Sequence, residues 1–264
     1  MARLLSLVQL VSIEFHAACN LAAAHDACPT ARADRYAGVV KDRTLDDDTI
    51  VDLAARLAQD YGFRGLFCWH AYNEPLVQMG RMFGLMGRIS AEVPDARYLL
   101  WTNGTLLPED CRSFSRFSNI QVSDYGGADS PRPERLQALR AACPQVVVKP
   151  GVLDGRCEWT PTLKPLRCTK PLVELLVDVY GNVLLCCFDW RGQASPGNLF
   201  RDGLEACMAR WEEMLPEIVA WPVSGRAPAL CQRCPFRASR MSTFDKHARH
   251  RAHVWMAQQE AAHG

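Results

Sequence analysis

Short apolar segments alternate with amphipathic helical segments over the first 150 residues, and this alternation constrains the fold more than any other feature of the chain. The apolar segments have the length and β-branched content of strands buried on both faces, and they cover residues 4–15, 65–71, 98–102, 120–123 and 145–149. Helices are predicted between them after Asp46, from Pro75 to about Val93, over 108–114 and from Pro131 to about Cys143. This order predicts a parallel α/β barrel or open sheet, with ligands at the carboxyl ends of the strands.

The pattern changes after about residue 155. Residues 172–179 and 183–188 are predicted to be the strands of a β-hairpin whose turn contains Gly181 and Asn182. A helix is predicted over 202–215, and the basic segment 237–263 has the composition of a solvated helical face. The second half is therefore expected to be a small extension built from a β-hairpin and a helix.

The charge balance excludes several classes of partner. The 30 Lys and Arg residues nearly cancel the 29 Asp and Glu residues, so the net charge of +1 gives no field that would attract nucleic acid or a membrane surface.

Glu14 and His16 follow the apolar N-terminal run at positions where a signal peptide is apolar or small, and no other segment approaches the ~20 apolar residues of a membrane span. We therefore expect a cytoplasmic protein, in which clustered thiols hold metal more often than they form disulfides.

Cysteine is unusually frequent, at 12 of 264 residues, and unevenly placed. Cys231 and Cys234 form a C-x2-C pair that needs two further ligands, which Cys186 on the hairpin and Cys168 just before it can supply. These four thiolates predict a metal site, either an iron–sulfur cluster or zinc. The cysteines and tryptophans inside apolar segments are instead predicted to be core residues: Cys68, Cys111, Cys143, Cys157, Cys207, Trp69, Trp101, Trp190 and Trp211.

The spacing in the second half resembles the C-terminal extension of the radical S-adenosylmethionine (SAM, AdoMet) enzymes. The matching residues, in chain order, are Cys168, Gly181, Cys186, Asp189, Gly197, Asn198, Leu199, Cys231 and Cys234. In this family the extension is called SPASM when it holds two auxiliary iron–sulfur clusters and twitch when it holds one. Four well-placed cysteines match the twitch form, and the resemblance implies one auxiliary cluster with Cys187 left over.

Three segments of the first half resemble the same family, and their order and spacing identify it. Cys19-Asn20-Leu21 follows the first strand, as the family's cluster loop does, and Thr102-Asn103-Gly104-Thr105 is similar to a recurrent family turn. The segment 70–76, which contains Asn73, Glu74 and Pro75, is similar to the Gly-Gly-Glu-Pro segment that binds the amino group of SAM. The resemblance therefore implies cofactor binding by Asn73, Glu74 and Asn103.

The same resemblance implies the architecture. It predicts an α/β fold with a partial (β/α) barrel over 1–155 and an auxiliary iron–sulfur domain over 156–236, the small cysteine-rich β-hairpin and helix extension. A basic helical tail over 237–264 completes the predicted chain.

The cluster loop departs from the family pattern. The usual C-x3-C-x2-C spacing, counted from Cys19, falls on Ala23 and Asp26, which do not replace thiolates well because cluster irons prefer soft sulfur ligands. Cys19, His25 and Cys28 offer an alternative set with imidazole in the middle place, a ligand known from Rieske centres. Three interpretations stay open: this set holds a catalytic [4Fe-4S] cluster, the loop has lost its cluster, or other ligands such as His16 take part.

The resemblance implies a chemistry as well. A reduced cluster would cleave SAM to a 5′-deoxyadenosyl radical that abstracts hydrogen from a small polar substrate, similar to an amino sugar or a cyclitol such as 2-deoxy-scyllo-inosamine. The expected outcome is a two-electron oxidation in secondary metabolism, with electrons from a reductant such as flavodoxin or ferredoxin. Lys149, Tyr125 and Arg156 at or just past strand ends are the candidate catalytic residues.

Three alternatives to this function remain at the level of sequence. One is a degenerate relative that holds only the auxiliary cluster and acts as a binding or electron-transfer partner. Another is a peptide-modifying radical SAM enzyme, and the third is an α/β enzyme stapled by zinc at Cys168, Cys186, Cys231 and Cys234.

Overall fold

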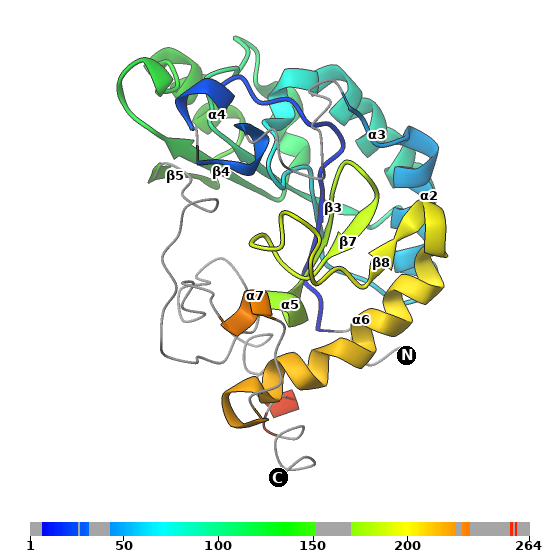
Figure 1. Cartoon of the computed structure of the whole chain (residues 1–264). Coiled ribbons are helices and arrows are strands. Elements are labelled where there is room, and N and C mark those ends of the chain that lie inside the picture. Colours follow the sequence, from blue (N-terminus) through cyan, green and yellow to red (C-terminus); the bar gives the residue numbers. More distant parts are fainter. Residues whose placement is uncertain are drawn as a thin grey trace.

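A computed structural model of the chain describes residues 7–25, 27–31, 43–151, 170–224, 229–232, 254, 255 and 257. Its centre is one open sheet of eight strands in the order β5-β4-β3-β2-β1-β6-β7-β8 (Figure 1). Neighbouring strands from β5 to β6 are parallel, and β7 and β8 are added antiparallel. The strands are β1 (Leu10–Ile13), β2 (Leu66–Cys68), β3 (Arg97–Thr102), β4 (Asn119–Asp124), β5 (Val146–Pro150), β6 (Glu174–Val177), β7 (Asn182–Leu184) and β8 (Gly197–Asn198).

Among the described residues, the α-helices between strands β1 to β5 are α2 (Asp47–Gln59), α3 (Met79–Glu92) and α4 (Pro133–Ala142). Asp46 begins α2 as predicted, since its carboxylate accepts a hydrogen bond from the Thr49 backbone N–H at 2.9 Å. Short 3-10 helices complete the connections: η1 (Ala22–Ala24), η2 (Pro29–Ala31), η4 (Pro75–Gln78), η5 (Arg112–Arg116) and η6 (Gly127–Asp129). Figure 1 shows α2 and α3 side by side along the sheet.

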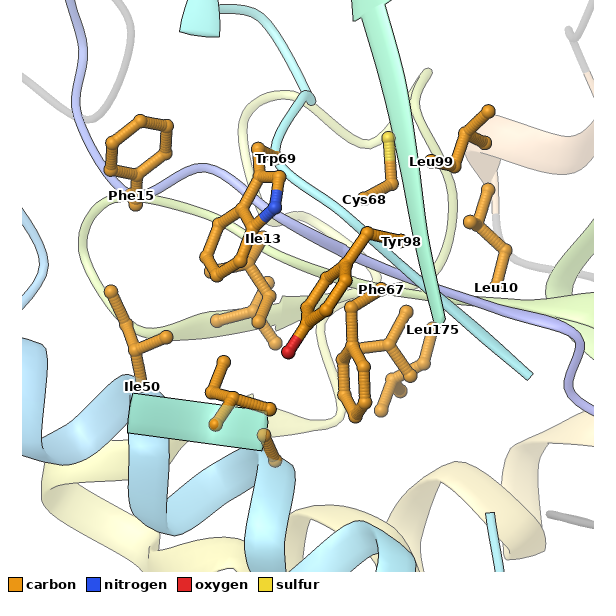
Figure 2. Packing of buried hydrophobic residues seen from close by; sticks show 14 of the residues in the cluster. Leu10, Ile13, Phe15, Ile50, Phe67, Cys68, Trp69, Tyr98, Leu99 and Leu175 are labelled. Carbon is orange, nitrogen blue, oxygen red and sulfur yellow. The ribbon is translucent and has the colours of Figure 1, made fainter. Parts of the chain in front are cut away.

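The sheet has two chemically different faces because side chains alternate along each strand. Figure 2 shows Phe67, Trp69 and Tyr98 toward the helices, with Ile50 of α2. Cys68 and Leu99 lie on the other side of the same strands. We call this second side the inner face, and its continuation along β3 to β5 carries the polar residues discussed below.

The C-terminal extension continues the sheet. The short helix α5 (Lys170–Val173) leads into β6, which pairs with β1, and Gly181 makes the turn into β7 with a φ of +80°. The helix α6 (Leu199–Ser224) follows β8 and changes direction at Gly203, where φ is +78°. The short helix α7 (Ala229–Gln232) contains Cys231.

The predicted fold class, a partial (β/α) barrel with a hairpin and helix extension, is confirmed. Several predicted bounds were too long. The strand predicted over 172–179 begins with the helical turn α5, and β7 ends at Leu184 because Asp189 accepts a hydrogen bond from the Leu185 N–H and bends the chain. The helix predicted over 108–114 is the shorter η5, and β8 was not predicted at all.

The predicted core residues that the structure describes are buried, with the exception of Trp101. Cys68, Cys111, Cys143 and Cys207 are at most 2% exposed, and Trp69, Trp190 and Trp211 are buried, whereas Trp101 is half-buried. Cys157 and most of the predicted basic tail lie outside the described residues. Among the described helices, none is both long enough and apolar enough to cross a membrane.

Candidate active site

Three chain segments meet at the carboxyl edge of the sheet, where β1, β2 and β3 end. The backbone N–H of Glu74 donates to the Ala18 carbonyl at 3.0 Å, which joins the loop after β1 to the segment after β2. Asn103, after β3, donates from Nδ2 to Asn20 Oδ1 at 3.0 Å, and Asn20 Nδ2 donates to Thr105 Oγ1 at 2.8 Å. The Cys19 loop is therefore held on two sides by the segments that the sequence analysis singled out.

Glu74 is the centre of this arrangement and is 3% exposed. One carboxylate oxygen accepts hydrogen bonds from Thr102 Oγ1 at 2.7 Å and the Leu76 N–H at 3.1 Å, and the other accepts from the Asn103 N–H at 2.8 Å. Burial raises the pKa of Glu74 to about 7, and the three donors limit the rise. The carboxylate therefore fixes the turn after β3 and begins η4.

Asn73 and His16 hold the neighbouring backbone. Asn73 donates from Nδ2 to the Trp69 carbonyl at 3.1 Å and accepts from the Ala71 N–H at 3.2 Å. His16 is fully buried, and its Nδ1 accepts a hydrogen bond from the Ala18 N–H at 3.1 Å. Burial first, and then the charge of Arg81, lower the pKa of His16 to about 4, so the ring is neutral at pH 7.

The proposed cluster ligands Cys19, His25 and Cys28 share the loop after β1. Cys28 and His25 are buried and Cys19 is half-buried, and the His25 ring lies edge-on to Tyr125 with centroids 4.4 Å apart. Burial raises the pKa of the Cys19 thiol to about 12, and the nearby charges of Glu74 and Cys28 act in the same direction. The thiol is thus neutral unless a metal takes its proton.

The donor set of this loop fits an iron–sulfur cluster in its chemistry. His25 Nε2 is buried and has no hydrogen-bond partner among the described residues, so this imidazole nitrogen is available to a metal. Two thiols and one imidazole are ligands that iron accepts. In the described part of the chain, no three His, Cys, Asp or Glu side chains gather closely enough to bind a single metal ion.

The second predicted metal site is only partly described. Cys186 follows β7 and Cys231 lies in α7, both half-buried, whereas Cys168 and Cys234 lie outside the described residues. The ligation of these four cysteines therefore stays a prediction.

The extension nevertheless contacts the first-half site directly. Tyr72 donates from its hydroxyl to the Cys187 carbonyl at 3.0 Å, and its own carbonyl accepts a hydrogen bond from Thr30 Oγ1. Cys187, which is not among the four predicted cluster ligands of the extension, thus contacts the first-half segment through its backbone carbonyl.

Of the three candidate catalytic residues, Tyr125 and Lys149 are described and Arg156 is not. Tyr125 follows β4 and packs between His25 and Gly151, where a Cβ would come within 2.5 Å of its ring. Lys149 on β5 donates from Nζ to Gln121 Oε1 at 2.8 Å. Tyr125 is therefore next to the Cys19 loop, and Lys149 belongs to the inner face.

Sequence reasoning did not identify four residues that hold the site together: Ala18, Asn20, Thr102 and Tyr72. Asn20, Thr102 and Tyr72 lie within segments that the sequence did single out, so their position was a usable signal. Ala18 acts through its carbonyl, and Tyr72 through a contact with a residue 115 positions away, which no local pattern encodes.

No protein-family model matches the chain, and no curated protein matches it. Among solved structures it is similar to BtrN in complex with AdoMet and 2-DOIA, with a TM-score of 0.66 and 21% identity over 87% of this chain and 93% of that one. A structure of BtrN in an open conformation gives a TM-score of 0.61 and 20% identity, covering 87% and 92% of the two chains. Native anSMEcpe with bound AdoMet gives 0.56 and 12%, with 97% of each chain covered. At these identities the similarity establishes a shared fold.

Proposed function

We propose that this chain is a radical SAM oxidoreductase that binds SAM and a [4Fe-4S] cluster at the carboxyl edge of its sheet. The observation that carries the proposal is the hydrogen-bonded unit formed by the Cys19 loop, the Asn73–Glu74 segment and the Asn103 turn. Two proteins of the same fold, BtrN and anSMEcpe, have AdoMet bound in their solved structures. The three segments are also those in which the sequence resembles the radical SAM family.

In this proposal Cys19, His25 and Cys28 hold the catalytic cluster. When bound, such a cluster together with SAM would supply a 5′-deoxyadenosyl radical. Both carboxylate oxygens of Glu74 accept hydrogen bonds from backbone N–H groups and from Thr102, so Glu74 would position the backbone of Leu76 and Asn103 beside the methionine part of SAM. In this proposal the side-chain amides of Asn73 and Asn103 also contact the methionine part of SAM.

The substrate we propose is a small polar molecule similar to an amino sugar or cyclitol, by analogy with the 2-DOIA bound to BtrN. Tyr125, Lys149 and Arg156 are its proposed catalytic contacts. The reaction is a two-electron oxidation, for which a reductant such as flavodoxin or ferredoxin delivers the first electron in the cytoplasm.

The auxiliary cluster belongs to the same proposal. Cys168, Cys186, Cys231 and Cys234 would hold it in a twitch-like domain over 156–236, next to the partial barrel over 1–155. The contact between Tyr72 and the Cys187 backbone supports a position of this domain beside the first site.

The test is the iron, sulfide and zinc content after anaerobic reconstitution, followed by an assay for 5′-deoxyadenosine. Two [4Fe-4S] clusters correspond to roughly eight irons per chain. With a reductant and SAM, the loaded protein is expected to release 5′-deoxyadenosine and methionine. Zinc in place of iron would contradict the proposal and favour the zinc-stapled enzyme.

Single variants assign the clusters. Cys19→Ala and Cys28→Ala should each lower the iron content to about four per chain and abolish SAM cleavage, since each removes a ligand of one [4Fe-4S] cluster. His25→Ala tests the unusual ligand in the same way. Cys143→Ala, at a buried core position that is not among the proposed ligands, is the control and should leave the iron content unchanged. A wild type that binds only about four irons, with no loss in the Cys19 and Cys28 variants, would instead indicate the degenerate form with an auxiliary cluster alone.

A further inference from the structure

The inner face of the sheet is chemically uneven between its two halves. On the β1 and β6 half, the buried carboxylate of Glu174 is already satisfied, since Ser12 Oγ donates to it at 2.8 Å and Lys170 forms an ion pair with it. Glu14, at the end of β1, accepts a hydrogen bond from the Val179 N–H at 3.1 Å. On this half, Glu14, Glu174 and Lys170 are therefore all engaged in contacts within the protein.

The β3 to β5 half carries a different set of groups. Register pairs Trp101 with Gln121 and Gln121 with Val147, and Lys149 is two residues further along β5, so their side chains share the inner face. The hydrogen bond from Lys149 Nζ to Gln121 Oε1 at 2.8 Å confirms that these two side chains lie on the same face. No Asp or Glu of the described residues forms an ion pair with Lys149, and Asp124 points to the turn at Gly126 and Ser130.

Lys149, Gln121 and Trp101 supply hydrogen-bond donors on this half, beside Asn119 and Ser123, which the register places on the same face. An ammonium carries three N–H donors, of which Lys149 uses one on Gln121 Oε1. The amide nitrogen of Gln121 adds two more donors. The indole Nε1 of Trp101 is buried without a hydrogen-bond partner among the described residues. Unlike Trp69 and Trp211, which are enclosed in the helix-side core, Trp101 is half-buried and borders the inner face.

Apolar surface flanks these donors. The His70 ring lies edge-on to Trp101 with centroids 5.8 Å apart, and Val147 is 42% exposed. Aromatic and aliphatic surface beside a few convergent donors is the composition of a site for a small ring-shaped ligand. A ligand that brings acceptors of its own would complement these donors.

We infer that this half of the inner face binds an oxyanion, a carboxylate or a phosphate, of a ring-shaped polar substrate, with Lys149 as the charged contact and Trp101 as the neutral donor. The inference rests on the proposed function for its setting, because it names the substrate class of that same site. Charge-assisted hydrogen bonds are about twice as strong as neutral ones, so Lys149 dominates the recognition. An amino group of the same substrate would have to lie away from Lys149.

The experiment compares four probes that share one ring: glucuronate, glucose 6-phosphate, glucosamine and glucose. Their dissociation constants are measured by ligand-observed NMR on the reconstituted protein with SAM. One of the two anionic probes is expected to bind at least about tenfold more tightly than glucose and glucosamine, as one charge-assisted hydrogen bond allows. The better anion distinguishes a carboxylate site from a phosphate site.

Variants locate the site. Lys149→Met should remove the preference for the anion, and Lys149→Arg should retain it. Trp101→Phe keeps the ring and removes one donor, so it should weaken anion binding by about two- to tenfold. Arg140→Met, which removes a positive charge from an exposed position on α4, is the matched control and should bind all four probes as the wild type does.

Several results would overturn the inference. They are equal binding of all four probes, no binding of either anion, a preference for glucosamine, or an anion preference that survives in Lys149→Met. Far-UV circular dichroism and the melting temperature establish that each variant is folded, and Trp101→Phe supplies an independent test of the same face. If the protein binds the anion through Lys149 but does not cleave SAM, the proposed function is wrong and the oxyanion site stands. If the protein cleaves SAM but its anion binding does not depend on Lys149, the oxyanion site is wrong and the proposed function stands.

Discussion

At the scale of the residue, Glu74 joins three chain segments, two of them through its buried carboxylate and the third through its backbone N–H. The resemblance to a known family implied that Asn73, Glu74 and Asn103 bind one cofactor, and the hydrogen bond from the Asn103 N–H to Glu74 places two of them in contact. The sequence did not show that the carboxylate oxygens of Glu74 accept hydrogen bonds from the protein's own backbone and from Thr102. That depends on backbone direction, which residue spacing does not encode.

Glu74 should make the stability of the protein depend on pH. Its pKa is about 7 in the folded protein and 4.5 in an unfolded chain, so between these values the folded protein keeps a proton that the unfolded chain releases. The free energy of unfolding should therefore fall by up to about 3 kcal/mol from this group as the pH rises from 4.5 to 7. Glu74→Gln should remove that slope, measured by urea unfolding at a series of pH values.

The difference between variant and wild type is the necessary readout, because His16 titrates in the opposite sense. Its pKa falls from 6.5 to about 4 on folding, so its contribution to stability is lost as the pH falls from 6.5 toward 4. Subtracting the two profiles cancels His16. Identical slopes for Glu74→Gln and the wild type would show that Glu74 is not the titrating group, and Glu134→Gln, at an exposed position on α4, is the control.

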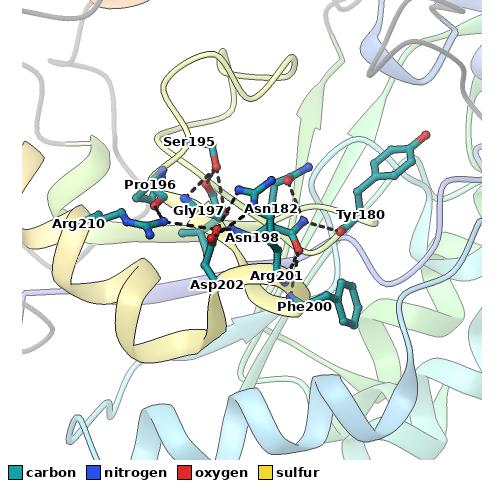
Figure 3. A network of polar contacts seen from close by, with 11 residues as sticks. Tyr180, Asn182, Ser195, Pro196, Gly197, Asn198, Phe200, Arg201, Asp202 and Arg210 are labelled. Carbon is teal, nitrogen blue, oxygen red and sulfur yellow. Dashed lines mark hydrogen bonds and ion pairs between the residues drawn. The ribbon is translucent and has the colours of Figure 1, made fainter.

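At the scale of the element, Asn198 begins α6 and also ties it to the hairpin. Its Oδ1 accepts hydrogen bonds from the Phe200 and Arg201 N–H groups at 3.0 and 3.2 Å, and its Nδ2 donates to the Tyr180 carbonyl and to Asn182 Oδ1 (Figure 3). Asn198→Ala should cost about 2–3 kcal/mol, because it removes a helix N-cap and two further hydrogen bonds.

A serine at this position separates the two roles of Asn198. Asn198→Ser retains an oxygen for the cap and loses the two donations, so about half of the loss should remain. Thermal and urea unfolding measure both variants. A serine variant as unstable as the alanine variant would contradict the separation of the roles.

Glycines in α3 and in the hairpin turn should respond in opposite directions to alanine. Gly84 and Gly87 are exposed in α3, and a Cβ would meet nothing within 4 Å, so each substitution should stabilise the protein by about 0.8–1 kcal/mol through helix propensity. Gly181 has a φ of +80°, and its Cβ would lie 2.6 Å from the Phe200 ring. Gly181→Ala should therefore cost about 1–2 kcal/mol. Urea unfolding of the three single variants checks the signs, and a stabilising Gly181→Ala would be inconsistent with this backbone conformation.

The elements that the sequence predicted best are those with long periodic patterns. The cap at Asp46 and the apolar period at Ile50, Leu53 and Leu57 placed α2 correctly. The sequence missed β8 because its two residues are a strand only through their register with β7. Likewise, Leu172 and Val173 have side chains typical of strands but lie in the helix α5. The chain begins to pair with β1 only at Glu174, and side-chain type does not show where that pairing begins.

At the scale of the whole molecule, the sheet runs without interruption from the first half into the second. Strand β1 is fully buried and pairs on one side with β2 and on the other with β6, which follows it in the chain by more than 160 residues. The sequence predicted a boundary near residue 155 from the change in pattern. A change of pattern marks a change of local structure and does not decide whether two parts fold separately.

The pairing of β1 with β6 predicts that the two halves unfold together. A chain cut after residue 155 would expose one edge of β1 and remove Leu175 and Val177, which pack in the same core as α2 and α3. The fragment 1–155 is therefore expected to lack a cooperative transition, whereas the full chain should unfold in one step with coincident far-UV circular dichroism and tryptophan fluorescence. Binding of a hydrophobic dye should distinguish the collapsed fragment from a folded one. A fragment with its own sharp transition, or two separate transitions in the full chain, would mean that β6 is an accessory to an independently stable barrel and not a part of its core.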